Sequence, residues 1–266
     1  MSKLNDPSLK KNGRRTSTNV PESRPSDIPE FSEEHPPTGD LLYYWKQRNN
    51  LFSRYEEGVW LTHDAWYEVT PENVAEKISQ HILQSPIETV IDAFCGVGGN
   101  TIQFALSASC KRVIAIDTNP TAILCAKHNA HIYGVLDKIE FIVGDFFELL
   151  NAKESILKAD AVFLSPPWGG PTYRNDKIFD LDTMLPYSAS FIFNQASKIS
   201  KNIALYIPRT SNLNQVAKLV PEGQKIQAVH YCVRKRSKAL TVYFGQLSKI
   251  KAEGVSAEEE EEEEEL

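Results

Sequence analysis

Five short apolar runs, each followed by a helical pattern, constrain the fold of this chain more than any other feature. The runs are rich in β-branched residues and lie at 89–91, 113–116, 139–143, 161–164 and 203–207. Runs of this kind are typical of parallel strands buried on both faces. Two further runs, 226–233 and 240–244, flank a basic turn and predict an antiparallel hairpin. The sequence therefore predicts an α/β fold of five βα units closed by a hairpin.

The two ends of the chain differ from this core in composition. Residues 1–40 hold six of the 15 prolines but one of the 26 aromatic residues, so they bury too little apolar surface to offset chain entropy. Residues 251–266 contain eight consecutive glutamates, which repel one another. We therefore expect a disordered arm, one domain over residues 41–250 and a disordered acidic tail. Within the domain, an aromatic extension over 41–70 precedes the core over 71–250.

Charge and cysteine usage narrow the class of protein. The formal net charge is −6, and without the eight tail glutamates it becomes +2, which permits an anionic partner without requiring one. No run approaches the roughly 18 uninterrupted apolar residues of a membrane helix, so we expect no membrane partner. The four cysteines form no CxxC pair and lie in apolar runs. This predicts reduced core thiols, with neither a disulfide framework nor a metal site.

A basic cluster in the arm bears on localisation and partners. Lys10, Lys11, Arg14 and Arg15 resemble a short nuclear-import signal, although a solvated charge run gives the same pattern. We expect the protein in the nucleus, with the nucleolus as a candidate site within it. The arm and the acidic tail are the segments that we expect to contact protein partners.

A glycine-rich loop follows the first predicted strand. The stretch DAFCGVGGN, residues 92–100, leads into an apolar helix, and Gly96 and Gly98 let the chain turn sharply and approach a ligand closely. Asp117 ends the second strand, where a carboxylate can accept both hydroxyls of a ribose. Together these motifs predict an adenosine-type ligand.

The residues near the loop favour S-adenosylmethionine over a dinucleotide. The GVGG spacing departs from the GxGxxG pattern that seats a pyrophosphate. Asp92 would repel a phosphate but attract the cationic methionyl amine of S-adenosylmethionine. Asp145, at the end of a later strand, lies where it can bind the adenine amino group, and a helix-capping aspartate is the alternative. The predicted cofactor is therefore S-adenosyl-L-methionine.

The stretch SPPWGGP, residues 165–171, carries the predicted chemistry. Its two prolines fix the backbone, so that carbonyl oxygens point in a set direction. An exocyclic amine of a base needs an acceptor for each N–H bond, and Ser165 and the Pro166 carbonyl can provide them while the nitrogen lone pair faces the methyl group. Trp168 offers a stacking face that suits a cationic base such as 7-methylguanine, and a core tryptophan is the alternative.

Further residues near the same loop suit a phosphate chain. Tyr173 continues the proline loop, and Arg209 follows the fifth strand. Lys238 lies in RKRSK, residues 234–238, which the pattern places in the hairpin turn. The two basic residues can face the same crevice, although RKRSK is by default a solvated turn.

With these motifs in place, the sequence resembles the class I S-adenosylmethionine-dependent methyltransferases, and among them the trimethylguanosine synthases, or cap hypermethylases. The likeness runs over about residues 41–248 and rests above all on DAFCGVGGNTIQFA together with SPPWGGP. It implies a Rossmann-like, seven-stranded, mostly parallel sheet with a C-terminal antiparallel hairpin and a small helical N-terminal extension. It also implies conversion of 7-methylguanosine caps on small nuclear and nucleolar RNAs to the 2,2,7-trimethyl form, by two transfers to guanine N2.

The resemblance also implies the roles of the site residues. The donor-binding residues would be Phe52, Thr70, Asp92, Gly96, Gly98, Asp117 and Asp145. The catalytic residues would be Ser165, Pro166 and Trp168. The residues that bind the methylated base and the triphosphate would be Asn129, Trp168, Tyr173, Arg209 and Lys238. Within the donor site, Asp92 would hold the amine, Asp117 the ribose and Thr70 the carboxylate. Tyr43 is a departure, because the family often has a lysine there that contacts the triphosphate. The nearest lysine in this chain is Lys46.

Two other interpretations stay open at this stage. A methyltransferase acting on adenine N6 or guanine N2 of ribosomal or transfer RNA can use the same proline-proline-aromatic loop, but it does not need the aromatic block at residues 43–67. A non-catalytic cap-binding protein would need neither a donor pocket nor amine acceptors. The intact Asp92, Asp117 and Ser165 argue against it.

Overall fold

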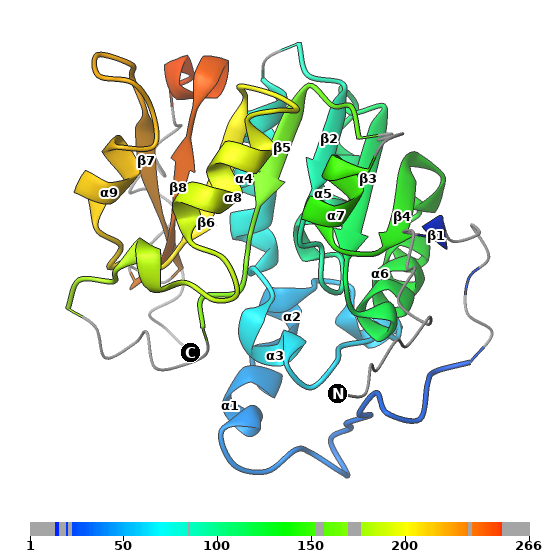
Figure 1. Cartoon of the computed structure of the whole chain (residues 1–266). Helices are drawn as coiled ribbons and strands as arrows, with labels where there is room; N and C mark the ends of the chain where they lie inside the picture. The colour runs from blue at the N-terminus through cyan, green and yellow to red at the C-terminus, as the bar shows by residue number, and fades with distance from the viewer. Residues whose placement is uncertain are drawn as a thin grey trace, which may run out of the picture.

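One mixed β-sheet organises the chain (Figure 1). The computed structural model describes residues 14–15, 20, 23–84, 86–152, 157–169, 177–233 and 236–251. The strands are β1 Arg14–Arg15, β2 Thr89–Asp92, β3 Arg112–Asp117, β4 Ile139–Val143, β5 Ala161–Leu164, β6 Ile203–Ile207, β7 Gln227–Val233 and β8 Arg236–Tyr243. Their order across the sheet is β1-β4-β3-β2-β5-β6-β8-β7.

Strand pairing follows the predicted topology. β2 pairs in parallel with β3 and β5, β3 with β4, and β5 with β6, whereas β8 is antiparallel to both β6 and β7. The seven strands β2 to β8 confirm the predicted α/β fold with its C-terminal hairpin. The sheet has one strand more than expected, because Arg14 of β1 lies opposite Val143 of the edge strand β4. A sheet edge can pair with any extended segment, and a two-residue strand has no periodic sequence signal.

Helices cover both faces of the sheet (Figure 1). They are α1 Leu41–Trp45, α2 Arg48–Leu51, α3 Ala65–Glu68, α4 Glu72–Leu83, α5 Gly99–Leu106, α6 Pro120–Ile132, α7 Phe146–Asn151, α8 Ala189–Ala196 and α9 Leu213–Ala217. Neighbouring residues of β2 point to opposite faces, since Val90 packs with Ile78 and Ile82 of α4 while Ile91 packs with Ile192 of α8. The central strand is therefore buried on both faces, as predicted.

Helix α4 begins one residue later than the sequence pattern indicates. We expect Thr70 as the N-cap and Pro71 as the first helical residue, but Pro71 is the N-cap. Its carbonyl accepts hydrogen bonds from the amides of Val74 and Ala75 (2.9 and 3.0 Å). Proline has no amide to satisfy, so it can precede a helix as readily as open one. The hydroxyl of Thr70 is consequently not used for capping.

The extension lies across the carboxyl ends of the central strands, where α1, α2 and α3 sit next to one another (Figure 1). Part of the segment before it also packs against the domain. Ile28 is buried, and the ring of Phe31 lies 5.9 Å from that of buried Trp66. Residues 23–40 thus differ from the disordered arm that composition predicts, because two apolar side chains meet an aromatic surface supplied by the extension. Most of the first 22 residues and the tail from residue 252 lie outside the described part.

The hairpin and one cysteine also differ from expectation. Residues 236–238 belong to β8 and not to a turn, because the pair Val233 and Arg236 extends the β7–β8 ladder. Cys232 is exposed, beside a register shift that follows Tyr231, whereas the other three cysteines are buried. Among the residues described, no helix is long and apolar enough to span a membrane, and no group of His, Cys, Asp or Glu is arranged to hold a metal ion.

Candidate active site

Three chain segments meet at the carboxyl ends of the central strands. Asp92 ends β2, Asp117 ends β3 and Ser165 follows β5. The amide of Ala93 donates to the carbonyl of Phe163 (3.1 Å), which ties the first segment to the third. The sheet continues from β2 to β3 and β4 on one side and to β5 and β6 on the other. Such a switch point is where α/β sheets bind their ligands.

Asp92 is the most deeply buried carboxyl group of the site, at 1% exposure. Its Oδ2 accepts a hydrogen bond from the Thr101 hydroxyl (2.5 Å), whereas its Oδ1 has no hydrogen-bond partner among the described residues. Burial raises the pKa of Asp92 to about 7, and the Thr101 hydroxyl and the backbone amides of Phe94 and Thr101 oppose the shift. A buried carboxylate with an unpartnered oxygen is stabilised when a cationic donor reaches it.

The carboxylate of Asp117 holds the glycine loop. Its Oδ2 accepts from the amide of Gly96 (2.9 Å) and its Oδ1 from the amide of Asn119 (2.8 Å). Burial raises the pKa of Asp117, and these two amides lower it. Gly98 has a φ of +95° at the start of α5, a conformation that favours glycine. Each oxygen of Asp117 keeps a lone pair that a ribose hydroxyl can use.

The extension packs directly on the glycine loop through Val69 and Thr70. A Cβ atom on Gly99 would lie 2.8 Å from Val69 Cγ2, so only glycine fits there unless the Val69 side chain moves. Buried Thr70 accepts a hydrogen bond at Oγ1 from Asn100 Nδ2 (2.9 Å), which leaves the Thr70 hydroxyl hydrogen for another acceptor. Asn100 Oδ1 is buried without a partner among the described residues.

Phe52 lies in a hydrogen-bonded junction between the extension and the core. It is buried, with its ring 6.2 Å from that of Tyr133. The next residue, Ser53, donates its amide and its hydroxyl to the Glu72 carboxylate (2.5 and 2.8 Å), and the Tyr133 hydroxyl donates to the same group (2.7 Å). The junction fixes the backbone around Phe52, while its contact with a donor stays a prediction.

Two predicted ligand contacts make hydrogen bonds within the protein. Asp145 Oδ1 accepts from two amides in the first turn of α7 (2.8 and 3.0 Å), so this residue caps the helix, and its contact with adenine stays a prediction. Asn129 is fully buried. Its Oδ1 accepts from the Trp60 amide (2.8 Å), and its Nδ2 donates to the carbonyls of Trp60 and Val97 (3.0 Å each). This differs from the base contact that the resemblance implies, because the Asn129 amide joins the extension to the glycine loop.

The proline loop presents Ser165 and Trp168 at the same edge of the sheet. Ser165 Oγ donates to the carbonyl of Phe94 (3.2 Å), so its hydrogen is occupied and its oxygen is left as an acceptor. Pro166 is buried. Trp168 is half-buried, and its Nε1 donates to the carbonyl of Tyr206 in β6 (3.3 Å), which orients the indole ring.

The predicted triphosphate contacts are only partly described. Arg209 is exposed two residues beyond β6, at the carboxyl edge of the sheet that also carries the proline loop. Tyr173 lies outside the described residues, and so does the side chain of Lys238, whose backbone belongs to β8. These three roles stay predictions.

Sequence reasoning missed two polar residues beside the glycine loop. Thr101 and Asn100 follow the glycines directly, and their buried side chains reach Asp92 and Thr70. The sequence offered one signal for them, since two adjacent polar residues stand in the first turn of a helix that is largely apolar.

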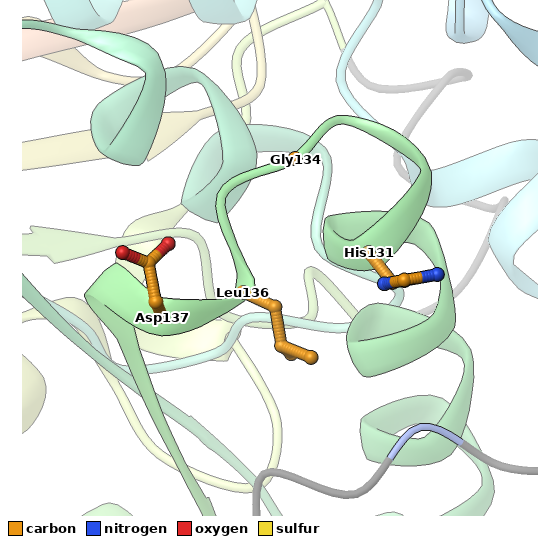
Figure 2. Close-up of a pocket in the computed structure, with 4 residues that line it drawn as sticks. All are labelled: His131, Gly134, Leu136 and Asp137. Atoms are coloured by element: carbon orange, nitrogen blue, oxygen red, sulfur yellow. The ribbon is translucent and has the colours of Figure 1, made fainter.

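A surface hollow lies at the far end of α6 (Figure 2). It is lined by His131, Gly134, Leu136 and Asp137. Helix α6 starts three residues after Asp117 and ends beside this hollow, just before β4 begins. The hollow therefore lies at the opposite edge of the sheet from the switch point and takes no part in the site.

The polar atoms of the switch point define the ligand that fits it. Asp92 Oδ1 and Asn100 Oδ1 are both buried acceptors without a donor among the described residues. The Asp92 carboxyl is negative when ionised, so a ligand that carries an ammonium group would satisfy it. The methionyl amine of an S-adenosylmethionine-type cofactor is such a group, so the residues present fit it.

Comparison with known proteins places these features in a family. Residues 87–247 match the sequence model of the RNA cap guanine-N2 methyltransferases. The trimethylguanosine synthase of Schizosaccharomyces pombe is 37% identical over 214 residues, which cover 79% of this chain and 88% of the relative. That of Saccharomyces cerevisiae is 37% identical over 185 residues, which cover 68% of this chain and 58% of the relative.

The fold has a counterpart among solved structures. A proposed methyltransferase from Porphyromonas gingivalis W83 superimposes with a TM-score of 0.60 over 79% of this chain and 50% of its own, at 14% identity. Methyltransferase fold and family together imply an S-adenosylmethionine-type cofactor and an RNA substrate. With a family match that spans most of the catalytic core, this chain belongs to the RNA cap guanine-N2 methyltransferases.

Proposed function

We propose that this protein converts 7-methylguanosine caps to the 2,2,7-trimethyl form, by two successive methyl transfers from S-adenosyl-L-methionine to guanine N2. Membership of the cap guanine-N2 methyltransferases and the likeness to the trimethylguanosine synthases of two yeasts support this reaction. The observation that carries it in this chain is the Ser165 hydroxyl. Its hydrogen is donated to the Phe94 carbonyl, so its oxygen is an acceptor at the switch point.

The proposed methyl-donor site is defined by polar atoms that can still form hydrogen bonds at the switch point. Asp92 Oδ1 would take the methionyl ammonium, and the spare lone pairs of Asp117 would take the ribose hydroxyls. The Thr70 hydroxyl would donate to the carboxylate, since its oxygen already accepts from Asn100. When bound, S-adenosylmethionine supplies a methyl group activated by its sulfonium.

The acceptor site positions an amine that is a weak nucleophile. The N2 lone pair of guanine is delocalised into the ring, so catalysis depends on orientation. Ser165 Oγ and the Pro166 carbonyl would each accept a hydrogen bond from one N–H group of N2. The N2 lone pair would then face the methyl group. Trp168 would stack on the base, and a cationic 7-methylguanine gains more from an indole face than an uncharged guanine does. As N2 gains the methyl group it loses one proton, which passes to water or through the Ser165 oxygen.

The RNAs and the compartment are proposed from sequence. Small nuclear and nucleolar RNAs are the proposed substrates, and the nucleus, including the nucleolus, is the proposed location. The basic cluster at residues 10–15, of which Arg14 and Arg15 form β1, supports the location. The resemblance to the cap hypermethylases supports the RNAs. The composition of the arm and of the acidic tail makes these segments the proposed contacts for protein partners.

A methyl-transfer assay with labelled S-adenosylmethionine tests the reaction. The acceptors are 7-methylguanosine diphosphate, guanosine diphosphate and a cap-free RNA. We expect transfer to the 7-methylated nucleotide alone, giving first a monomethylated and then a dimethylated N2 product. Transfer to the cap-free RNA alone would refute the proposal and indicate an exocyclic-amine methyltransferase of ribosomal or transfer RNA.

A further inference from the structure

A row of aromatic side chains lies on the outer face of the extension. The rings of Tyr43 and Tyr44 are 5.4 Å apart, those of Tyr44 and Tyr67 are 4.8 Å apart, and those of Tyr67 and His63 are 5.7 Å apart. Tyr43 is 58% exposed and Tyr67 is 36% exposed. We call these four residues the aromatic row.

Local sequence explains why these rings face outward. In α1 the buried residues are Leu41 and Trp45, four positions apart, so Tyr43 lies on the opposite face of the helix. In α3, Trp66 is buried and Tyr67 is not. The core therefore does not need the exposed rings. Tyr44 is partly buried against the core and joins the exposed rings of Tyr43 and Tyr67. Single exposed aromatics are ordinary, whereas exposed rings that are joined in this way suit a binding surface.

The aromatic row belongs to the extension, which lies across the carboxyl ends of the strands that carry the active site (Figure 1). Tyr67 is two residues before Val69, whose Cγ2 packs against the glycine loop at Gly99. The following residue, Thr70, is hydrogen-bonded to Asn100 in the first turn of α5. RNA that follows a cap bound at the switch point would therefore pass along the extension that carries the row.

We propose that the aromatic row stacks the first nucleotides of the single-stranded RNA that follows the cap. The inference rests on the proposed function and extends it from the cap to the RNA chain. Successive bases stack on successive aromatic rings without regard to sequence, as a substrate range of several RNAs requires. Exposed Lys46 lies three residues after Tyr43, on the same side of α1, where it can meet a phosphate. Two acidic residues neighbour the row: Asp64, whose Oδ1 lies 3.1 Å from His63 Nδ1 and pairs with it when His63 is protonated, and Glu68, which follows Tyr67.

The test compares a 7-methylguanosine-capped single-stranded pentanucleotide with 7-methylguanosine triphosphate. Affinities for the full-length protein are measured by fluorescence with saturating S-adenosylhomocysteine, alongside kcat/KM for both acceptors. Wild type is expected to bind the capped pentanucleotide more tightly than the mononucleotide. Replacing Tyr43 and Tyr67 by alanine is expected to weaken pentanucleotide binding about 5- to 100-fold. Mononucleotide binding is expected to change by less than about twofold, since no ring of the row then has a base to stack.

Two matched variants separate stacking from other effects. The double Tyr→Phe variant at positions 43 and 67 keeps the rings and is expected to bind as wild type does. Leu106→Ala removes an exposed apolar side chain at the far end of α5 and serves as the surface control. Because stacking carries no charge, the alanine effect is expected to persist unchanged at higher salt, unlike a phosphate contact.

The outcomes distinguish this inference from the proposed function. If wild type methylates the mononucleotide but binds both ligands equally, or if the alanine variant keeps full pentanucleotide affinity, the aromatic row does not hold RNA. A fall in mononucleotide turnover equal to the fall in pentanucleotide binding would also overturn the inference, because the row would then belong to the cap pocket. Failure of wild type to methylate the mononucleotide refutes the proposed function instead.

Discussion

Asp92 makes donor binding depend on pH in a way that can be calculated. Its pKa in the protein without ligand is raised to about 7 by burial. A bound ammonium group at Oδ1 stabilises the carboxylate and lowers that pKa toward its ordinary value of 3.8. Only the ionised form then binds the donor well, so a proton must leave Asp92 before binding below pH 7. Asp92 is ionised in about nine-tenths of the protein molecules at pH 8 and in about one-tenth at pH 6.

The expected result is a dissociation constant about tenfold weaker at pH 6 than at pH 8, or about 1.4 kcal/mol. Calorimetry with S-adenosylhomocysteine, which carries the same amine, measures it. Repeating the titration in buffers of different ionisation enthalpy counts the protons. Binding is expected to release about 0.9 proton at pH 6 and about 0.1 at pH 8. Equal affinities at the two values, with no proton released at pH 6, would refute the role of Asp92.

A variant and its control complete the test. Asp92→Asn is expected to bind the ligand weakly and to lose the pH dependence, whereas Asp137→Asn, at the remote hollow, is expected to keep it.

The carboxyl group of Asp92 also affects the free energy of unfolding. Because its folded pKa is raised, the folded state holds an extra proton between about pH 4 and pH 7, so stability falls as pH rises through that window and levels off above it. The full effect is about 4 kcal/mol, and Asp92→Asn is expected to flatten it in thermal unfolding.

Three further substitutions test the site geometry. Trp168→Ala is expected to reduce kcat/KM for 7-methylguanosine diphosphate by about tenfold or more while calorimetric donor affinity is kept; loss of both would mean that the ring supports the donor pocket. Gly99→Ala places a Cβ atom 2.8 Å from Val69 Cγ2, so it is expected to cost about 1–3 kcal/mol in thermal unfolding, and adding Val69→Ala should restore part of that. Asn129→Ala leaves backbone groups of Trp60 unpaired and is expected to cost about 2–4 kcal/mol in denaturant unfolding. Normal stability with lost turnover in that variant would instead favour a base contact.

The fold was accessible from sequence because burial on both faces leaves a local mark. A strand such as β3, with Val113 to Ile116 wholly apolar, is typical of a strand that is buried on both faces of a layered α/β fold. Parallel strands also end at the same edge, so Asp92 and Asp117 could be assigned to one site from their positions alone. Boundaries were less certain, since Pro71 can cap a helix or open it with similar local chemistry.

Long-range partners explain what the sequence did not predict. The hydrogen bonds of Asn129 run to Trp60, 69 residues earlier, in an extension without regular periodicity. The placement of Ile28 and Phe31 likewise depends on a surface that composition does not describe. For Asp145, helix capping and adenine binding require the same residue at the same position, so only the three-dimensional structure distinguishes which amides it meets.

The strand order has a consequence for how the chain reaches its folded state. β7 is synthesised before β8, yet β8 lies between β6 and β7. During translation, the hydrogen-bonding edge of β6 therefore stays open until residues 236–243 have left the ribosome. An early pairing of β7 with β6 would occupy the place of β8 and would have to be undone. We therefore expect the hairpin to form first and to dock on β6 afterwards, so that the edge of β6 stays open to other strands until then.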